Sequence, residues 1–201
     1  LAPDMDLVTP PLHVRIKPIN VCNHNCWYCA YRADNLQLGE SMNLKDQIPE
    51  HKMSEIIENL IDMDVKAITF SGGGEPFLYK PLSRVIRRLA ESSVQFASLT
   101  NGSRLQGELA ELFAFHATWL RISLDGWDDK SYAKYRGVRL GEFSDLLKRI
   151  RNFVKLKGTC YLGVNLNVDQ DNASHVRELV IRLSEAGVQS VKIAPCIVSN
   201  D

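Results

Sequence analysis

Apolar and polar positions follow two different periods along this chain, and the period switches repeatedly after residue 50. An apolar residue at every third or fourth position indicates a helix, whereas a short apolar run that ends at glycine indicates a buried strand. Helices are expected over residues 51–64, 82–91, 105–115, 143–157 and 173–186. Strands are expected over residues 14–19, 66–70, 94–99, 119–124, 160–168 and 191–194.

Strict alternation of strands and helices favours a parallel sheet with right-handed crossovers. Six strands separated by five helical segments can form either an open doubly wound sheet or a curved, partly closed barrel. Pro18 weakens the first strand, because proline has no N–H to donate to a ladder. Residues 1–12 are expected to form an N-terminal extension, and residues 30–50 and 126–142 two long connections.

The composition is that of an ordinary soluble globular domain. The 201 residues include 24 basic and 24 acidic ones, so the net charge does not point to nucleic acid or an anionic membrane as a partner. No apolar run approaches the ~18 residues of a membrane span, and the first residues lack the basic region of a signal peptide. A cytoplasmic protein is therefore expected, with a core over residues 13–201. Because the chain begins with Leu1 rather than Met, we interpret it as a trimmed chain, and we expect that residues can be missing at its C-terminus as well.

Glycine, cysteine and polar residues gather where the predicted strands end. In parallel α/β folds, ligands bind at the carboxyl ends of the strands. These ends carry the cysteine loop 22–29 and residues 72–76, 100–102, 123–126, 165–169 and 195–196. Because such ends meet at one rim, the sequence predicts a single site there.

Three of the five cysteines fall within eight residues, and the other two lie far along the chain. The five are Cys22, Cys26, Cys29, Cys160 and Cys196. An odd number with one tight cluster fits a reduced compartment and a metal site better than disulfides. Structural zinc needs four protein ligands, so a zinc-stabilised α/β binding domain would recruit His24, Cys160 or Cys196 as the fourth. A [4Fe–4S] cluster held by three cysteines instead leaves one iron open to a substrate or cofactor.

The spacing C-x3-C-x2-C, with the aromatic Tyr28 before the last cysteine, resembles the signature of radical S-adenosylmethionine (SAM) enzymes. The resemblance implies that Cys22, Cys26 and Cys29 ligate a [4Fe–4S] cluster whose fourth iron binds the amino and carboxyl groups of SAM. It also implies that Tyr28 lies against the adenine. The implied fold is the α/β family core, a parallel six-stranded partial (β/α)6 TIM-like barrel. The pattern is closest to the SPASM-type and molybdopterin-precursor-synthase-like branches.

Gly73, Gly74 and Glu75 resemble the GGE motif of the same family. The family role of this motif is to bind the methionyl ammonium of SAM, which carbonyl oxygens and a carboxylate suit physically. Taken alone, a glycine-rich strand-to-helix turn is more often only a turn.

Four further residues at the rim are implied to contact SAM. Ser123 and Asp125 would hold the ribose hydroxyls and the SAM carboxylate, Arg136 would meet the carboxylate, and Asn167 would face the adenosine. The alternatives are a strand-ending Asp-Gly turn for Asp125 and an exposed loop arginine for Arg136.

The resemblance implies that one electron from the reduced cluster cleaves SAM to methionine and a 5′-deoxyadenosyl radical. That radical would abstract hydrogen from a peptide or small-molecule substrate. The implied electron donor is a flavodoxin or ferredoxin, and neither membrane nor nucleic acid is indicated. Because no second cysteine cluster follows Cys29, the sequence leaves peptide, carbohydrate, nucleoside and cofactor chemistry all open.

Overall fold

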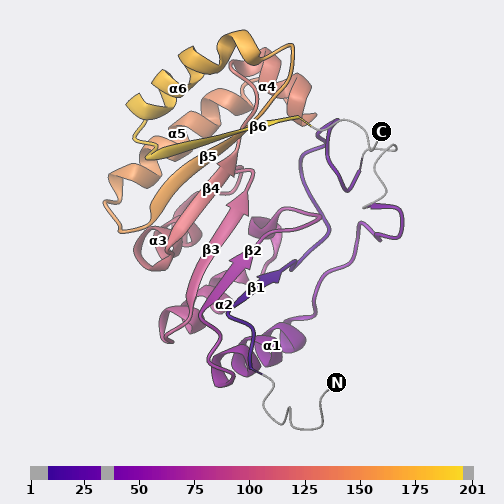
Figure 1. Cartoon of the computed structure of the whole chain (residues 1–201), viewed down its shortest axis with the longest axis vertical. Helices are drawn as coiled ribbons and strands as arrows, with labels where there is room; N and C mark the ends of the chain where they lie inside the picture. The colour runs from indigo at the N-terminus through magenta and orange to yellow at the C-terminus, as the bar shows by residue number, and fades with distance from the viewer. Residues whose placement is uncertain (1–8, 33–38, 197–201) are drawn as a thin grey trace.

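Six strands form one parallel sheet, in which the strand order across the sheet is the order along the chain (Figure 1). The computed structural model describes residues 9–32 and 39–196. The strands are β1 (His13–Ile16), β2 (Ala67–Phe70), β3 (Gln95–Thr100), β4 (Trp119–Ser123), β5 (Tyr161–Val168) and β6 (Ser190–Pro195). Each strand pairs only with its neighbours in sequence, so β1 and β6 are the two edges of the described sheet.

The helices lie together on one side of this sheet (Figure 1). The α-helices are α1 (Glu50–Asp62), α2 (Leu82–Ala90), α3 (Gly107–His116), α4 (Asp129–Arg136), α5 (Glu142–Lys155) and α6 (Val176–Glu185), and two 3-10 turns are η2 (Pro76–Leu78) and η3 (Ala173–His175). Right-handed crossovers between adjacent parallel strands place every connecting helix on the same side. The partial (β/α)6 barrel predicted from the sequence is therefore confirmed. No helix in the described ranges is long and apolar enough to cross a membrane.

The main core fills the space between the sheet and these helices. Even-numbered residues of β1 to β5, and odd-numbered residues of β6, point toward the helices, because side chains of a strand alternate between its two faces. Phe113 of α3 shows the packing, with ring centroids 4.8 Å from Phe77 and 5.8 Å from Phe96. Ile68, Leu120 and Val164 are likewise fully buried. Each such side chain contributes about 1.5–3 kcal/mol of hydrophobic free energy to folding.

Two expectations from the sequence are corrected. The first strand ends at Ile16 rather than at residue 19, because Pro18 and Ile19 pair with residues 47–48 instead of with β2. The carbonyl of Pro18 accepts a hydrogen bond from the N–H of Ile48, and Ile19 forms an antiparallel bridge with Gln47. Residues 126–142, expected to be a long connection, contain the helix α4.

Candidate functional site

The carboxyl ends of the strands surround a cavity of about 390 Å³. Ten of the eleven predicted site residues line it, namely Cys22, Cys26, Tyr28, Cys29, Gly73, Gly74, Glu75, Ser123, Arg136 and Asn167. They come from the loops after β1 and β2, from β4 and β5, and from α4. The expected convergence on one rim is thus present in the fold.

The cysteine loop is folded by its own backbone and by Arg32. The N–H of Cys29 donates to the carbonyl of Cys26 at 3.1 Å, which forms a tight turn between the second and third cysteines. The guanidinium of Arg32 donates to the carbonyl of His24 at 2.8 Å and to that of Cys22 at 3.3 Å. These bonds hold the three thiols on one wall of the cavity.

Two polar side chains lie beside the cysteine sulfurs. Arg136 Nη1 is 3.4 Å from Cys26 Sγ, and Asn101 Nδ2 is 3.9 Å from Cys22 Sγ. Burial raises the pKa of the Cys22 thiol above its usual value. The guanidinium of Arg136 and the amide of Asn101 thus place N–H donors beside two of the three thiols.

The glycine loop packs directly against the cysteine loop. A Cβ at position 74 would lie 2.3 Å from the carbonyl oxygen of Val21 and 2.5 Å from that of Ile19, which leaves no room for a side chain. The N–H of Glu75 donates to the same carbonyl of Val21 at 2.9 Å. Gly74 therefore permits the contact that joins the two predicted motifs.

The carboxylate of Glu75 is buried and held by protein donors on both oxygens. Oε1 accepts from Phe77 N at 3.0 Å and from Thr100 Oγ1 at 2.5 Å, and Oε2 accepts from Asn101 N at 2.7 Å. Burial raises the pKa of Glu75, although these hydrogen bonds oppose the shift. The residue fastens the end of β3 to the glycine loop, and its contact with SAM stays a prediction.

Asp125 lies behind the cavity wall rather than on it. The residue has a left-handed backbone, with φ 70°, and its side chain turns inward at the end of β4. Asp125 Oδ1 accepts from Asn167 N at 2.6 Å, and Oδ2 accepts from the hydroxyl of Tyr28 and pairs with Arg136 Nη2 at 2.7 Å. The predicted residues Tyr28, Asp125, Arg136 and Asn167 thus form one connected network.

Helix α4 delivers Arg136 to this network. The helix begins at a capping box, in which Asp128 accepts from Ser131 N at 2.7 Å, and it ends at Gly137 with φ 58°. Arg136 Nε donates to the carbonyl of Leu124 at 3.0 Å, and its own carbonyl accepts from Asn25 N at 2.8 Å. This helix is not among those expected from the sequence; the spacing Asp-x-x-Ser followed by Gly137 is the signal that could have located it.

His24 also lines the cavity, and the family resemblance implies no role for it in holding the cluster. It is 3% exposed, and neither ring nitrogen has a hydrogen-bond partner within the described ranges. Burial, assisted by the positive charges of Arg136 and Arg149, lowers the pKa of His24 to about 3. The imidazole is therefore neutral, and its ring packs edge-on against Tyr132 at 6.1 Å.

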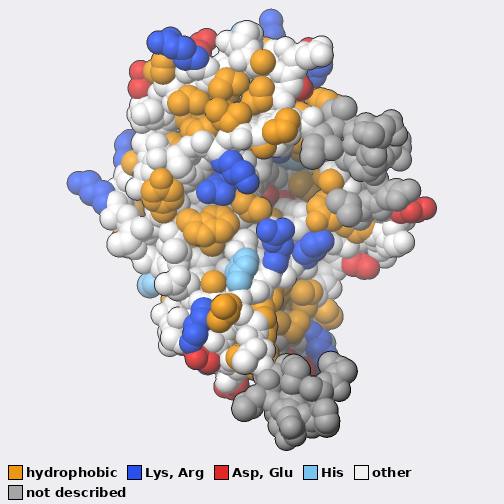
Figure 2. Space-filling model, in the orientation of Figure 1, with side chains coloured by type: hydrophobic (Ala, Val, Ile, Leu, Met, Phe, Trp, Pro, Cys, Tyr) orange, Lys and Arg blue, Asp and Glu red, His pale blue; other side chains and the backbone are white. Residues whose placement is uncertain are grey.

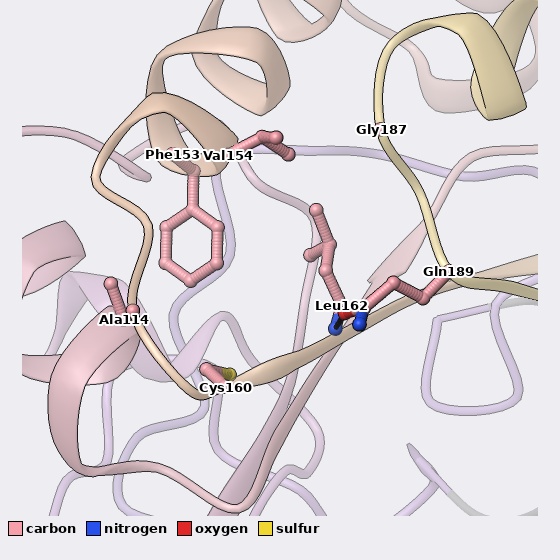
Figure 3. Close-up of a pocket in the computed structure, with 8 residues that line it drawn as sticks. Ala114, Phe153, Val154, Cys160, Leu162, Gly187 and Gln189 are labelled. Carbon is pink, nitrogen blue, oxygen red and sulfur yellow. Dashed lines mark hydrogen bonds between the residues drawn. The ribbon is translucent and has the colours of Figure 1, made fainter.

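Cys160 belongs to a separate cavity at the other end of the sheet. This cavity of about 220 Å³ lies at the start of β5, where Phe153 and Val154 of α5 face Cys160 and Leu162 (Figure 3). Burial raises the pKa of Cys160 to about 12, so the thiol is protonated at neutral pH. The structure thus places Cys160 far from the loop whose fourth zinc ligand it could have been.

The donor set at the rim fits an iron–sulfur cluster. Three thiols from one loop face a common cavity, and a guanidinium beside Cys26 offsets negative charge. Across residues 9–32 and 39–196, no three His, Cys, Asp or Glu side chains are close enough to share a single metal ion. Cysteines spread around a cavity wall suit a multi-iron cluster, in which each thiolate binds a different iron.

Known proteins resemble this chain along most of its length. A family model described as the radical SAM superfamily matches residues 16–183. A probable GTP 3′,8-cyclase of Pyrobaculum aerophilum is 24% identical over 178 residues, which are 87% of this chain and 55% of the relative. An S-adenosylmethionine-dependent nucleotide dehydratase of Lacinutrix mariniflava is 25% identical over 139 residues, which are 66% of this chain and 29% of the relative. The chain thus spans about half, or less, of these relatives.

Solved structures share the fold. Streptococcus suis SuiB bound to S-adenosylmethionine superposes with a TM-score of 0.74 and 19% identity, over 96% of this chain and 42% of SuiB. SuiB bound to its precursor peptide SuiA gives a TM-score of 0.72 and 20% identity, over 94% and 40%. Since the family match runs from β1 into α6 and includes all three clustered cysteines, this chain belongs to the radical SAM superfamily and is an enzyme.

Proposed function

We propose that this chain binds a [4Fe–4S] cluster through Cys22, Cys26 and Cys29 and cleaves SAM at the open iron. The observation that supports this most is the meeting of the three thiols and the glycine loop 72–74 on one cavity. We include in the proposal a core over residues 13–201 and an electron donor such as a flavodoxin or ferredoxin.

The residues around the cavity have distinct roles in this proposal. When bound and reduced, the cluster would supply one electron to SAM, whose carbon–sulfur bond breaks to give methionine and a 5′-deoxyadenosyl radical that removes hydrogen from the substrate. Arg136 Nη1, 3.4 Å from Cys26 Sγ, would donate to that sulfur of the cluster loop. Gly73 and Gly74 offer backbone groups to the methionyl ammonium, and Ser123 and Asn167 offer side chains to the adenosine.

The substrate is expected to enter from the uncovered face of the sheet, below the rim. Relatives differ in what their names say they act on, since two are named for nucleotides and SuiB was solved with a peptide. The radical step itself needs no acid or base from the protein. The chain's contribution is orientation and the exclusion of water from the cavity.

The test is electron paramagnetic resonance of the anaerobically reconstituted, reduced protein, with and without SAM. We expect a [4Fe–4S] signal that changes when SAM is added. Cys26→Ala should lose iron and signal, whereas Cys160→Ala should keep both, because Cys160 lies at the opposite end of β5.

Two results would contradict the proposal. If the protein binds one zinc ion and forms no cluster, the result would favour a zinc-stabilised α/β binding domain without catalysis. A cluster signal indifferent to SAM would separate cluster binding from SAM cleavage and leave only the first part standing.

A further inference from the structure

Within the described strands, the face of the sheet away from the helices carries basic side chains and no acidic ones. The parallel register sets the odd-numbered residues of β1 to β5 and the even-numbered residues of β6 side by side on this face. In one row, Arg15 aligns through Thr69 and Ala97 with Trp119 and Tyr161. The next row contains Arg121 beside Gly163, and the row after it pairs Asn165 with Lys192. None of these residues, odd-numbered in β1 to β5 and even-numbered in β6, is acidic.

The cations on this face have no carboxylate partners. Arg15, Arg121 and Lys192 take part in none of the ion pairs within the described ranges. Among the described residues, three acidic ones lie at the rim: Glu75 and Asp125 are buried and hydrogen-bonded, and the half-buried Asp169 accepts from the hydroxyl of Tyr135 at 2.6 Å. Figure 2 shows Lys and Arg side chains together near the middle of this view. Although the chain has equal numbers of acidic and basic residues, the basic ones predominate on this face of the sheet.

Arg121 is held in place on this face. Its guanidinium carbon lies 5.4 Å from the ring of Trp119, in a cation–π contact. A Cβ at position 163 would lie 3.3 Å from Arg121 Nε, so Gly163 leaves the room that the side chain occupies. A guanidinium that is stacked and partly buried loses little entropy when it binds an anion.

The spacing of the cations fits a ligand with more than one negative charge. Arg121 and Lys192 lie two strands apart and two residues apart along the strands, about 12 Å at the backbone, a gap that their long side chains can span. Arg15 lines the main cavity, so the charged face continues into the region where SAM is proposed to bind. Asn165, which is paired with Lys192 in the register, adds a half-buried polar side chain to the same face.

We propose that this face binds a small substrate that carries two or more phosphate groups, with Arg121 and Lys192 as its anion-binding residues. The proposal rests on the proposed function, because it places the substrate next to the SAM cavity. Planar guanidinium groups match phosphate oxygens in geometry as well as charge. Among the substrate classes left open by the sequence, this arrangement selects a phosphorylated small molecule over a peptide.

The test is isothermal titration calorimetry of the reconstituted protein with inorganic tripolyphosphate. We expect Arg121→Gln and Lys192→Gln each to weaken binding at least tenfold, which is about 1.4 kcal/mol. The control is Arg151→Gln, an exposed cation of α5 on the helix side of the sheet, which should bind like the wild type. Circular dichroism verifies that the variants are folded.

Three outcomes would overturn the inference: no binding of tripolyphosphate, equal weakening by Arg151→Gln, or tighter binding of a tetraglutamate peptide than of tripolyphosphate. The SAM-dependent change in the cluster signal keeps this result separate from the proposed function. Arg121→Gln should retain that change, because Arg121 is not among the residues that line the cavity. Phosphate binding without any response to SAM would overturn the proposed function and leave the anion site intact.

Discussion

The guanidinium of Arg136 and the carboxylate of Asp125 form a buried ion pair, with Nη2 and Oδ2 2.7 Å apart and side chains 6% and 0% exposed. The pair joins the last turn of α4 to the end of β4, and Arg136 also reaches Cys26 Sγ. The wall of the cavity is therefore one electrostatic unit built from three separate segments of the chain.

We expect Arg136→Met to lower the free energy of unfolding by about 3–5 kcal/mol, because it leaves the Asp125 carboxylate buried without a counter-charge. Chemical denaturation measures this loss. Arg139→Met is the matched control, since Arg139 pairs with Asp145 at the surface and such pairs contribute less than about 1 kcal/mol. Equal losses in the two variants would show that the buried ion pair contributes no more to the free energy of unfolding than the exposed one.

The N-terminal cap of α4 is expected to contribute measurably to stability. Asp128→Ala should cost about 1 kcal/mol, because it removes the acceptor for Ser131 N. That backbone hydrogen bond lowers the pKa of Asp128, so the stabilisation is present above the ordinary carboxyl pKa and is lost as pH falls through the lower folded value. Unfolding at pH 7 and near pH 3 checks this: the wild type and the variant should differ less at acid pH. Asp128→Asn, which keeps an acceptor, should show a smaller loss at pH 7.

Cys160 should make the protein sensitive to alkali. Its folded pKa of about 12 lies above the ordinary thiol value, so the folded state keeps a proton that the unfolded chain releases. Stability is therefore full below about pH 9 and falls above it, by up to about 1.4 kcal/mol per pH unit from this group. Unfolding measured between pH 8 and 10 should show a shallower decline for Cys160→Ala. Identical slopes would mean that the thiol ionises normally in the folded protein.

The two glycines of the predicted motif should differ in their tolerance of a side chain. A Cβ at position 74 meets backbone atoms of the cysteine loop, whereas one at position 73 meets Met42 Sδ at 2.4 Å, the end of a flexible side chain. We expect Gly74→Ala to lower the iron content after reconstitution several-fold, and Gly73→Ala to retain most of it. Iron per chain is the measurement, and equal iron in both variants would contradict a close contact between the two loops.

The local pattern of apolar residues predicted much of this fold. It failed where the conformation of a segment depends on hydrogen bonds to residues outside that segment. Apolar periodicity located all six strands and five of the helices to within a few residues. It missed α4, since this short helix has little apolar periodicity and its two ends are defined by hydrogen bonds, at Asp128 and at Gly137. It also extended the first strand to residue 19, because the partners that draw Pro18 and Ile19 away lie near residue 48.

The sequence by itself determined the parallel architecture and the family, because strand and helix periods and the spacing of Cys22, Cys26 and Cys29 are properties of short segments. The surroundings of those cysteines, and the set of charges that share a face, follow from the folded arrangement of distant segments. Arg136 reaches Cys26 across 110 positions, and Arg15, Arg121 and Lys192 share one face through the register of five strand pairs. Such neighbours depend on how the whole chain closes, because side-chain contacts between distant segments leave no trace in local spacing.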